Sequence, residues 1–157
     1  MRLIDYISPE RVLPSMGARS KEDALVELSR LLVGSEEDDG AAGRVLMVLK
    51  ERESLASTGI GGHIAIPHGK ISLAGGGLSL GLARCLEGLN FDAVDGEPVR
   101  LFFVLVAPEK STGIHLKALA RISRLCREPG FKDRLLEAVG TQEMLEILEH
   151  EESKYWL

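Results

Sequence analysis

The amino-acid sequence predicts an α/β fold, a three-layer sandwich in which helices cover both faces of a mixed central sheet. Segments with the periodicity of amphipathic helices occur before, between and after short apolar strands, which is the pattern of an α/β domain. Residues 101–106 form a continuous apolar run, typical of a central strand covered on both faces. Not every pair of strands is separated by a helix, so we expect a mixed sheet rather than a purely parallel one.

The N-terminal half is expected to contain two helices and two strands. Ser20 is a suitable N-cap for the first helix, whose apolar stripe ends at Gly34. The second helix is expected over about residues 40–53. A short buried strand follows at residues 64–66, and leucines alternate with small residues in a further strand at 78–83.

Three helices are expected after the apolar run. They are a helix capped by Ser111 or Thr112 and ended by Pro129, a helix over residues 131–139, and a last helix capped by Thr141. The acidic run at residues 149–152 is expected to be a solvated, fraying helix end. The aromatic tail at residues 155–157 could cover the sheet, form a dimer contact or fray.

The composition excludes several classes of function. The chain has 157 residues, which suits one domain with a proper core, so we assign residues 1–157 to a single domain. The net charge is −5 and no run of Lys and Arg is long, so we expect no nucleic-acid binding. No apolar run is long enough for a transmembrane helix and the N-terminus is too polar for a signal peptide. Cys85 and Cys126 stand alone, which favours a cytoplasmic protein with reduced, core-packed thiols.

The most informative segment is residues 57–70, a glycine-rich loop followed by a very short apolar strand and a histidine. Pro67 has no backbone donor, so regular strand pairing is expected to stop there. Gly69 allows a sharp exit from the turn. His68 should therefore be held at a strand end, facing solvent with few side chains around it. This presentation suits a nucleophilic imidazole that must meet a large partner.

Other chemistry fits this segment poorly. Both glycine-rich phosphate-binding patterns would need glycine at Ile64, and the Walker pattern would also need Ser or Thr at Ile71. A metal site would have to combine His63, His68 and His115, which lack the short spacing of metal-binding histidine pairs, so no metal is expected. A cysteine nucleophile with a histidine base is also disfavoured, because neither cysteine is expected on a sharp turn.

Two further residues are candidates for phosphate contacts. His115 should lie in the first turn of a helix, where backbone N–H groups and the helix dipole favour an anion. The alternative, which physics alone favours, is an ordinary residue of the first helical turn. Arg52 ends the second helix, where it could clamp a phosphate with its planar guanidinium or simply complement the negative helix end.

The same segment carries the resemblance to a known family. Glutamate, glycine and apolar residues stand around His68 in the order and spacing of the type 2 enzyme IIA signature of the bacterial phosphoenolpyruvate-dependent phosphotransferase system. The residues are Glu53, Ile60, Gly61, Ile64, Ala65, Ile66, Pro67, His68 and Gly69. The likeness extends through residues 90–99, the apolar run and residues 114–116. The chain therefore resembles the fructose/mannitol/nitrogen-regulatory class over nearly its whole length.

The resemblance implies an α/β sandwich that carries a phosphoryl group on a histidine. His68 corresponds to the phosphorylated histidine, His115 to the second active-site histidine, and Arg52 to the arginine before the active loop. The implied donor is the phosphohistidine of a small histidine-containing phosphocarrier protein, and the implied attacking atom is Nε2 of His68. Such a transfer requires neither ATP nor a metal, so no cofactor is expected.

We also expect backbone N–H groups of the glycine-rich loop to contact the phosphoryl group, because positioning and charge neutralisation carry most of the catalysis in phosphoryl transfer. The loop residues are Ser57, Thr58, Gly59 and Gly61. Lys70 is a further candidate that could instead point to water.

Three functions remain open at this stage. The loop at residues 57–61 looks more like the nitrogen-regulatory branch, and Gly62 stands where the mannitol branch tends to carry an acidic residue. The first hypothesis is thus a phosphoryl carrier that regulates other proteins. The alternatives are a fructose- or mannitol-specific IIA component that passes phosphate to a IIB protein, and a non-catalytic module that only binds partners. The sequence does not indicate the regulated target.

Overall fold

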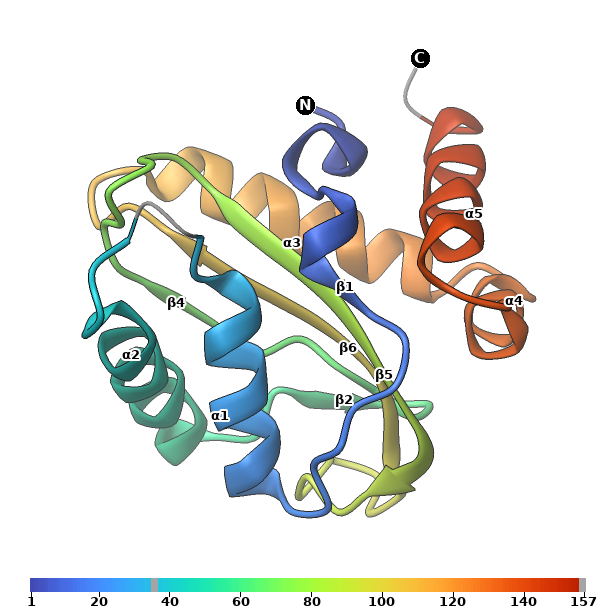
Figure 1. Ribbon diagram of the computed structural model, residues 1–157. Coiled ribbons are helices and arrows are strands. Elements are labelled where there is room, and N and C mark those ends of the chain that lie inside the picture. The colour runs from blue at the N-terminus through green and yellow to red at the C-terminus, as the bar shows by residue number, and fades with distance from the viewer. Residues whose placement is uncertain (35–36, 156–157) are drawn as a thin grey trace.

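The protein is a three-layer α/β sandwich, as predicted. The structure is a computed structural model that describes residues 1–34 and 37–155. Helices α1 (Lys21–Leu32) and α2 (Ala41–Leu55) cover one face of the sheet, and α3 (Thr112–Cys126) covers the other, with α4 (Phe131–Glu137) and α5 (Thr141–Ser153) beside it (Figure 1). Within the described residues, no helix has the length and apolar character that crossing a membrane requires.

The central sheet of the described chain is mixed, with the strand order β1-β5-β6-β3-β2. Strands β5 and β6 are antiparallel, whereas β3 and β4 each pair in parallel with β6. The strands are β1 (Val12–Leu13), β2 (Gly59–Gly61), β3 (Ile64–Ala65), β4 (His68–Lys70), β5 (Ser79–Leu89) and β6 (Val99–Ala107). The predicted strand at 78–83 is therefore the start of a longer strand that forms the antiparallel hairpin with β6.

Strands β3 and β4 lie one after the other along the same edge of β6. Pairing stops at Ile66 and Pro67 and then resumes, with His68 opposite Leu105. The expectation that regular pairing ends at Pro67 is therefore only half correct. Proline cannot donate a hydrogen bond, but the Pro67 carbonyl still accepts one from the Leu105 N–H at 3.1 Å. The pairing of this edge with β6 is thus interrupted just before His68 and resumes at His68 itself.

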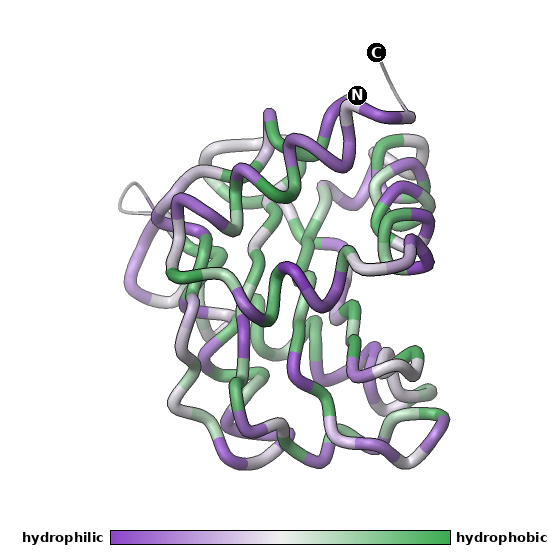
Figure 2. The backbone as a smooth tube through the Cα atoms, turned by 90° about the vertical axis from the view of Figure 1, so that its right-hand side faces the viewer, coloured by the Kyte–Doolittle hydropathy of each residue, from purple (hydrophilic) through white to green (hydrophobic). Residues whose placement is uncertain are grey.

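The core has two layers, one on each face of the sheet. Phe103 and Leu105 of β6 belong to the layer under α3, while Phe102 and Val104 belong to the layer under α1 and α2. All four side chains are fully buried. This alternation confirms that the apolar run is a central strand covered on both faces. Figure 2 shows hydrophobic and hydrophilic residues mixed along the helices, as expected of helices with one buried side.

The predicted caps were correct at one helix only. Ser20 caps α1, since its hydroxyl accepts the Asp23 N–H at 3.1 Å. Ser111 occupies the N-cap position of α3, but its hydroxyl donates to the Pro108 carbonyl instead of capping the helix. At α5, the cap position belongs to Gly140.

Thr141 is the first residue of α5 and makes no side-chain cap, so its prediction as a cap is wrong. The Glu143 carboxylate in the first turn accepts the N–H of Val139, the residue before the N-cap, at 3.1 Å. A carboxylate at this end of a helix also complements the helix dipole. The helix was predicted correctly from the sequence, but its N-cap residue was not.

The acidic end of α5 is only half solvated, because Glu151 and Glu152 are buried while Glu149 and His150 are exposed, so the prediction of a solvated, fraying end is wrong for its last two residues. Glu152 is fully buried, and its carboxylate accepts the N–H groups of Leu3 and Ile4 in the N-terminal 3-10 helix. Arg121 of α3 lies 3.6 Å from the same carboxylate. The charge of Glu152 is therefore satisfied by partners from distant parts of the sequence, which a charge run by itself does not reveal.

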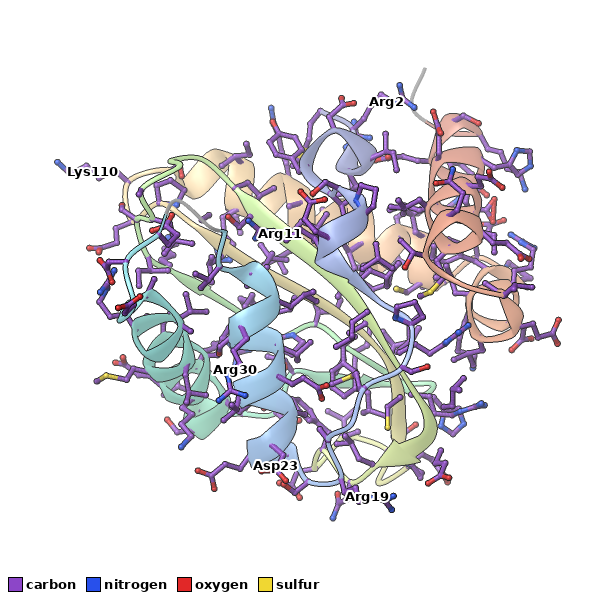
Figure 3. All side chains as sticks on the ribbon, viewed as in Figure 1. Arg2, Arg11, Arg19, Asp23, Arg30 and Lys110 are labelled. Atoms are coloured by element: carbon purple, nitrogen blue, oxygen red, sulfur yellow. The ribbon has the colours of Figure 1, made fainter. Side chains whose placement is uncertain are left out.

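Glu151 is buried in the same way and pairs with Arg134 of α4 at 2.7 Å. Exposed charges lie close by, since Arg2 stands beside α5 (Figure 3) with its guanidinium 3.6 Å from Glu149. In the tail, Tyr155 packs its ring 4.4 Å from the Arg124 guanidinium. Residues 156 and 157 lie outside the described residues.

Both cysteines are free; Cys85 is packed in the core as predicted, whereas Cys126 is half-buried against it. Cys85 is buried, and burial raises the pKa of the Cys126 thiol to about 12. A thiol with such a pKa stays protonated at neutral pH and is a poor nucleophile.

Replacing Glu152 by alanine is expected to lower the free energy of unfolding by about 2–4 kcal/mol, because two backbone N–H groups lose their acceptor and the half-buried Arg121 loses an ion-pair partner. Urea denaturation of the variant measures this loss. Glu149→Ala on the same helix is the matched control, and its exposed ion pair should account for less than about 1 kcal/mol. Equal losses in the two variants would contradict the assigned role of Glu152.

Candidate functional site

His68 lies in a pocket where three elements meet. The cavity of about 520 Å³ lies between α2, β4 and the first turn of α3. Its lining residues are Val48, Glu51, Arg52, Leu55, His68, Gly69, Lys70 and His115. The structure therefore brings together the three catalytic residues expected from the sequence. It also shows that His68 is half-buried among other side chains, so the expectation of an open site with few neighbours is wrong.

The position of His68 in the sheet directs its ring toward α3. Ile64 and Ile66 belong to the core layer under α3, and His68 follows two residues later. Its ring faces the ring of His115, with centroids 5.4 Å apart and ring planes tilted by 51°. The two imidazoles come from a strand end and a helix start that are far apart in the sequence.

A backbone carbonyl determines the tautomer of His68. Nδ1 of the ring lies 2.7 Å from the carbonyl oxygen of Ile66. A carbonyl oxygen can only accept a hydrogen bond, so Nδ1 must carry the proton and donate it. In the neutral ring, Nε2 then keeps its lone pair. The interruption of the ladder before His68 thus leaves one ring nitrogen as a nucleophile.

His115 is buried and has one unsatisfied ring nitrogen. The residue is 8% exposed, and its Nε2 has no hydrogen-bond partner among the described residues. It lies in the first turn of α3, as predicted, and its backbone N–H donates to the Ser111 carbonyl at 3.3 Å. A buried polar atom without a partner costs about 1–3 kcal/mol, so this nitrogen is well suited to meet an oxygen of a bound group.

Burial favours the neutral form of both histidines. The pKa of His68 is lowered mainly by burial and further by the positive charge of Arg52, against the opposing effects of the Ile66 hydrogen bond and of Glu53. The pKa of His115 is also lowered mainly by burial, with smaller contributions from His68 and Lys70. Both rings should therefore be neutral at pH 7.

Arg52 lies at the edge of the pocket in the last turn of α2. Its Nη1 donates to the carbonyl of Ala56 at 2.7 Å, just beyond the end of the helix. The two interpretations made from the sequence are therefore compatible: the guanidinium complements the helix end and also contributes positive charge beside His68.

The loop residues do not line this pocket. Ser57 accepts the Gly59 N–H at 3.0 Å through its hydroxyl, and the Thr58 N–H donates to the carboxylate of Glu53 at 3.0 Å. Gly59 and Gly61 belong to β2, where Gly61 has a φ of 93° that only glycine adopts readily. The N–H groups of Thr58 and Gly59 are already bonded within the chain, so their contact with a phosphoryl group stays a prediction.

Gly69 has a different role from the one expected. It lies within β4 rather than at a sharp exit, and a Cβ at this position would clash with Cγ1 of Val48 on α2. The absence of a side chain therefore lets α2 approach the strand that carries His68. This close approach brings Arg52 to the pocket.

The sequence analysis missed the role of one face of α2. Val48, Glu51, Arg52 and Leu55 all line the pocket, and they stand three or four residues apart along the helix. This spacing places side chains on one face, so extending the stripe from Arg52 would have identified them. Leu55 is 79% exposed, which makes it an apolar rim of the site.

His63 lies apart from this pocket and is half-buried. Its backbone has a φ of 69°, and its Nδ1 donates to the Pro98 carbonyl at 2.8 Å. In the part of the chain that the structure describes, no cluster of three or more His, Cys, Asp and Glu side chains is placed to hold a metal ion.

The fold and the site together define an α/β domain that presents a pair of histidines at an interrupted edge of its sheet. Comparison with known proteins assigns it to a family. The matching family model is described as "Phosphoenolpyruvate-dependent sugar phosphotransferase system, EIIA 2" and covers residues 5–151. The chain belongs to this family, which confirms the resemblance seen in the sequence.

Three relatives illustrate the relationship. The chain is 38% identical over 151 residues to a nitrogen regulatory protein of Bradyrhizobium diazoefficiens, covering 94% of this chain and 95% of that protein. It is 37% identical over 131 residues to a fructose-specific EIIA component of Haloferax volcanii, covering 82% of each. The crystal structure of the nitrogen regulatory protein IIA-Ntr from Neisseria meningitidis matches with a TM-score of 0.84 at 30% identity, covering 93% of this chain and 98% of that one.

The pH titration of the two histidines should reflect their burial. We expect NMR titration of His68 and His115 to give midpoints below 6.5, the ordinary value for histidine. The unfolded chain then binds more protons than the folded one as the pH falls below that value. The part of the stability due to these groups is therefore complete above the unfolded-state pKa and decreases as the pH falls through it. A short histidine peptide in the same buffer is the reference, and a midpoint at or above its value would contradict the prediction.

Proposed function

We propose that this protein is a phosphoryl carrier that accepts a phosphoryl group on Nε2 of His68 from the phosphohistidine of a small histidine-containing carrier protein. The observation that carries the proposal is the pair of ring nitrogens in one pocket. Nε2 of His68 is left with a lone pair by the Ile66 hydrogen bond, and the neighbouring His115 has a buried Nε2 with no partner in the described chain.

The transfer exchanges one nitrogen–phosphorus bond for another. The lone pair on Nε2 of His68 attacks phosphorus while the bond to the carrier's histidine breaks, and the leaving imidazole keeps the bonding electron pair. Positive charge develops on the His68 ring as the new bond forms. The Ile66 carbonyl oxygen lies 2.7 Å from Nδ1. It stabilises that charge because it accepts a hydrogen bond from the Nδ1–H group throughout the reaction.

The positive charges around the pocket suit the transition state of phosphoryl transfer. The transition state of phosphoryl transfer is loose and spreads negative charge over the non-bridging oxygens. Arg52 and Lys70 line the pocket and supply positive charge, and Nε2 of His115 can donate a hydrogen bond once its ring carries the proton there. Arg52 is held by its bond to Ala56 and His115 by burial before the donor arrives, which is the arrangement that makes electrostatic stabilisation effective.

A protein donor fits the surface around the pocket better than a small molecule does. Leu55 on α2 is 79% exposed and lines the pocket, and Leu116 on α3 is 59% exposed and follows His115, which also lines it. Exposed apolar side chains around a polar site are typical of protein contact surfaces. They support docking of a carrier protein that brings its phosphohistidine to His68.

The proposed role of the carrier is regulation of the nitrogen type. The relatives from Bradyrhizobium diazoefficiens and Neisseria meningitidis, matched over nearly their full lengths, bear the name nitrogen regulatory protein. Phosphorylation would add a charge of about −1.5 to −2 to the pocket face. Such a change could alter which target protein binds there.

The alternative is a fructose-specific component that passes the phosphoryl group to a IIB protein. The 37% identical relative from Haloferax volcanii, a fructose-specific EIIA component, favours this alternative. The two roles use the same first step and differ in the acceptor of the second. Transfer from the phosphorylated protein to a purified IIB protein distinguishes them.

Replacing His68 by alanine should abolish phosphorylation. The purified protein is incubated with phosphoenolpyruvate, enzyme I and the histidine-containing carrier, and intact-mass spectrometry then counts the phosphoryl groups. We expect one acid-labile group on the wild type and none on His68→Ala. The exposed His150 provides the matched control, since His150→Ala should still accept one group. A His68→Ala protein that accepts phosphate at the wild-type rate would refute the mechanism.

A further inference from the structure

Glu53 is a buried carboxylate beside the site that does not line the pocket. It follows Arg52 in the last turn of α2, and its side chain is 4% exposed. One carboxylate oxygen accepts the N–H of Thr58 at 3.0 Å and also the Thr58 hydroxyl. The other oxygen lies 2.9 Å from Nζ of Lys21 on α1. Three donors, one of them a cation, thus satisfy this buried charge.

The bonds continue from Thr58 to the ring of His68. The carbonyl of Thr58 accepts the N–H of Ile66 at 2.9 Å. The carbonyl oxygen of the same Ile66 accepts a hydrogen bond from the Nδ1–H group of His68 at 2.7 Å. A series of contacts therefore leads from Lys21 to the imidazole: an ion pair to Glu53, then hydrogen bonds that involve Thr58 and Ile66, with the backbone linking one bond to the next within each of these two residues.

These contacts hold Ile66 at a point where no strand pairing with β6 holds it. Ile66 lies between β3 and β4, so neither strand includes it. Its N–H is bonded to the Thr58 carbonyl, and Thr58 is held by Glu53. If Thr58 moved, the Ile66 carbonyl would lose the direction that makes it an acceptor for His68.

We propose that Glu53 and Thr58 are positioning residues for His68. They hold the Ile66 carbonyl, which keeps the proton on Nδ1 and so leaves Nε2 as the nucleophile. The effect on phosphoryl transfer rests on the proposed function, whereas the effect on the tautomer does not. Lys21 supports the series from α1, with its ammonium 4.9 Å from the centroid of the Phe91 ring.

The test compares two substitutions with conservative and matched controls. Thr58→Val removes the hydroxyl and keeps the backbone bonds, while Glu53→Gln removes the charge. Thr58→Ser keeps the hydroxyl and should behave as the wild type. Ser54→Ala and Glu22→Gln remove the same groups at exposed positions nearby, so they control for the loss of a hydroxyl or a charge as such.

The first readout is the tautomer of His68 in the unphosphorylated protein, measured by two-dimensional NMR of the ¹⁵N-labelled ring. We expect the wild type, Thr58→Ser and both controls to show the Nδ1–H form. Thr58→Val and Glu53→Gln should show a substantial fraction of the Nε2–H form. A purely structural role would lower stability in both variants and leave the tautomer unchanged.

The second readout is the rate of transfer from the phosphorylated carrier. A nucleophile held less firmly should lower kcat by about tenfold or more, while KM for the carrier stays the same because the docking surface is intact. Thr58→Ser should restore kcat. A normal tautomer together with a normal kcat in Thr58→Val and Glu53→Gln would overturn the proposal.

The two readouts separate this proposal from the function on which it rests. If the wild type accepts no phosphate from any carrier, the proposed function fails, and the tautomer measurement still decides the positioning role. If Glu53→Gln does not fold, Thr58→Val decides alone, because it removes the hydroxyl bond by which Glu53 holds Thr58 and leaves the buried carboxylate in place.

Discussion

The hydrogen bond from Nδ1 of His68 to the carbonyl of Ile66 is the interaction on which the rest of the site depends. A histidine at a strand end could present either ring nitrogen, and the proposed role as phosphoryl acceptor requires that one of them be free. The 2.7 Å bond settles this choice, since a carbonyl can only accept. The carbonyl is free to do so because Pro67 interrupts the pairing of the edge strand with β6 and β4 resumes it at His68. The interruption in strand pairing thus leaves a carbonyl that orients the ring of His68.

Packing around that break supplies the remaining groups of the pocket. Gly69 lets α2 come close to β4, with Val48 in the space that a side chain would fill, and Arg52 lies one turn further along the same helix. From the other face, the first turn of α3 places His115 with its ring centroid 5.4 Å from that of His68. Burial lowers the pKa of both imidazoles, so the environment that assembles the site also keeps its nucleophile neutral. Membership of the EIIA 2 family agrees with this assembly.

Those parts of the fold and of the site that depend on neighbouring residues in the chain could be predicted from the sequence. Hydrophobic periodicity placed the helices and the central strand, and Pro67 beside His68 indicated an unusual strand end. What the sequence could not show are contacts between distant segments. The burial of Glu152 depends on an N-terminal segment that meets α5 only in the folded chain. The need for Gly69 depends on Val48, which packs from another helix. Charge runs and glycines were therefore misread where tertiary partners determine their role.

The central claim is that the fold leaves Nε2 of His68, and not Nδ1, to carry the phosphoryl group. The most direct test is NMR of the ¹⁵N-labelled protein after phosphorylation by the carrier, in which the coupling between phosphorus and the ring nitrogens identifies the bonded atom. The account predicts a phosphoryl group on Nε2, with the proton retained on Nδ1 and donated to Ile66. A phosphoryl group on Nδ1 would contradict it, because that product requires the bond to Ile66 to be broken.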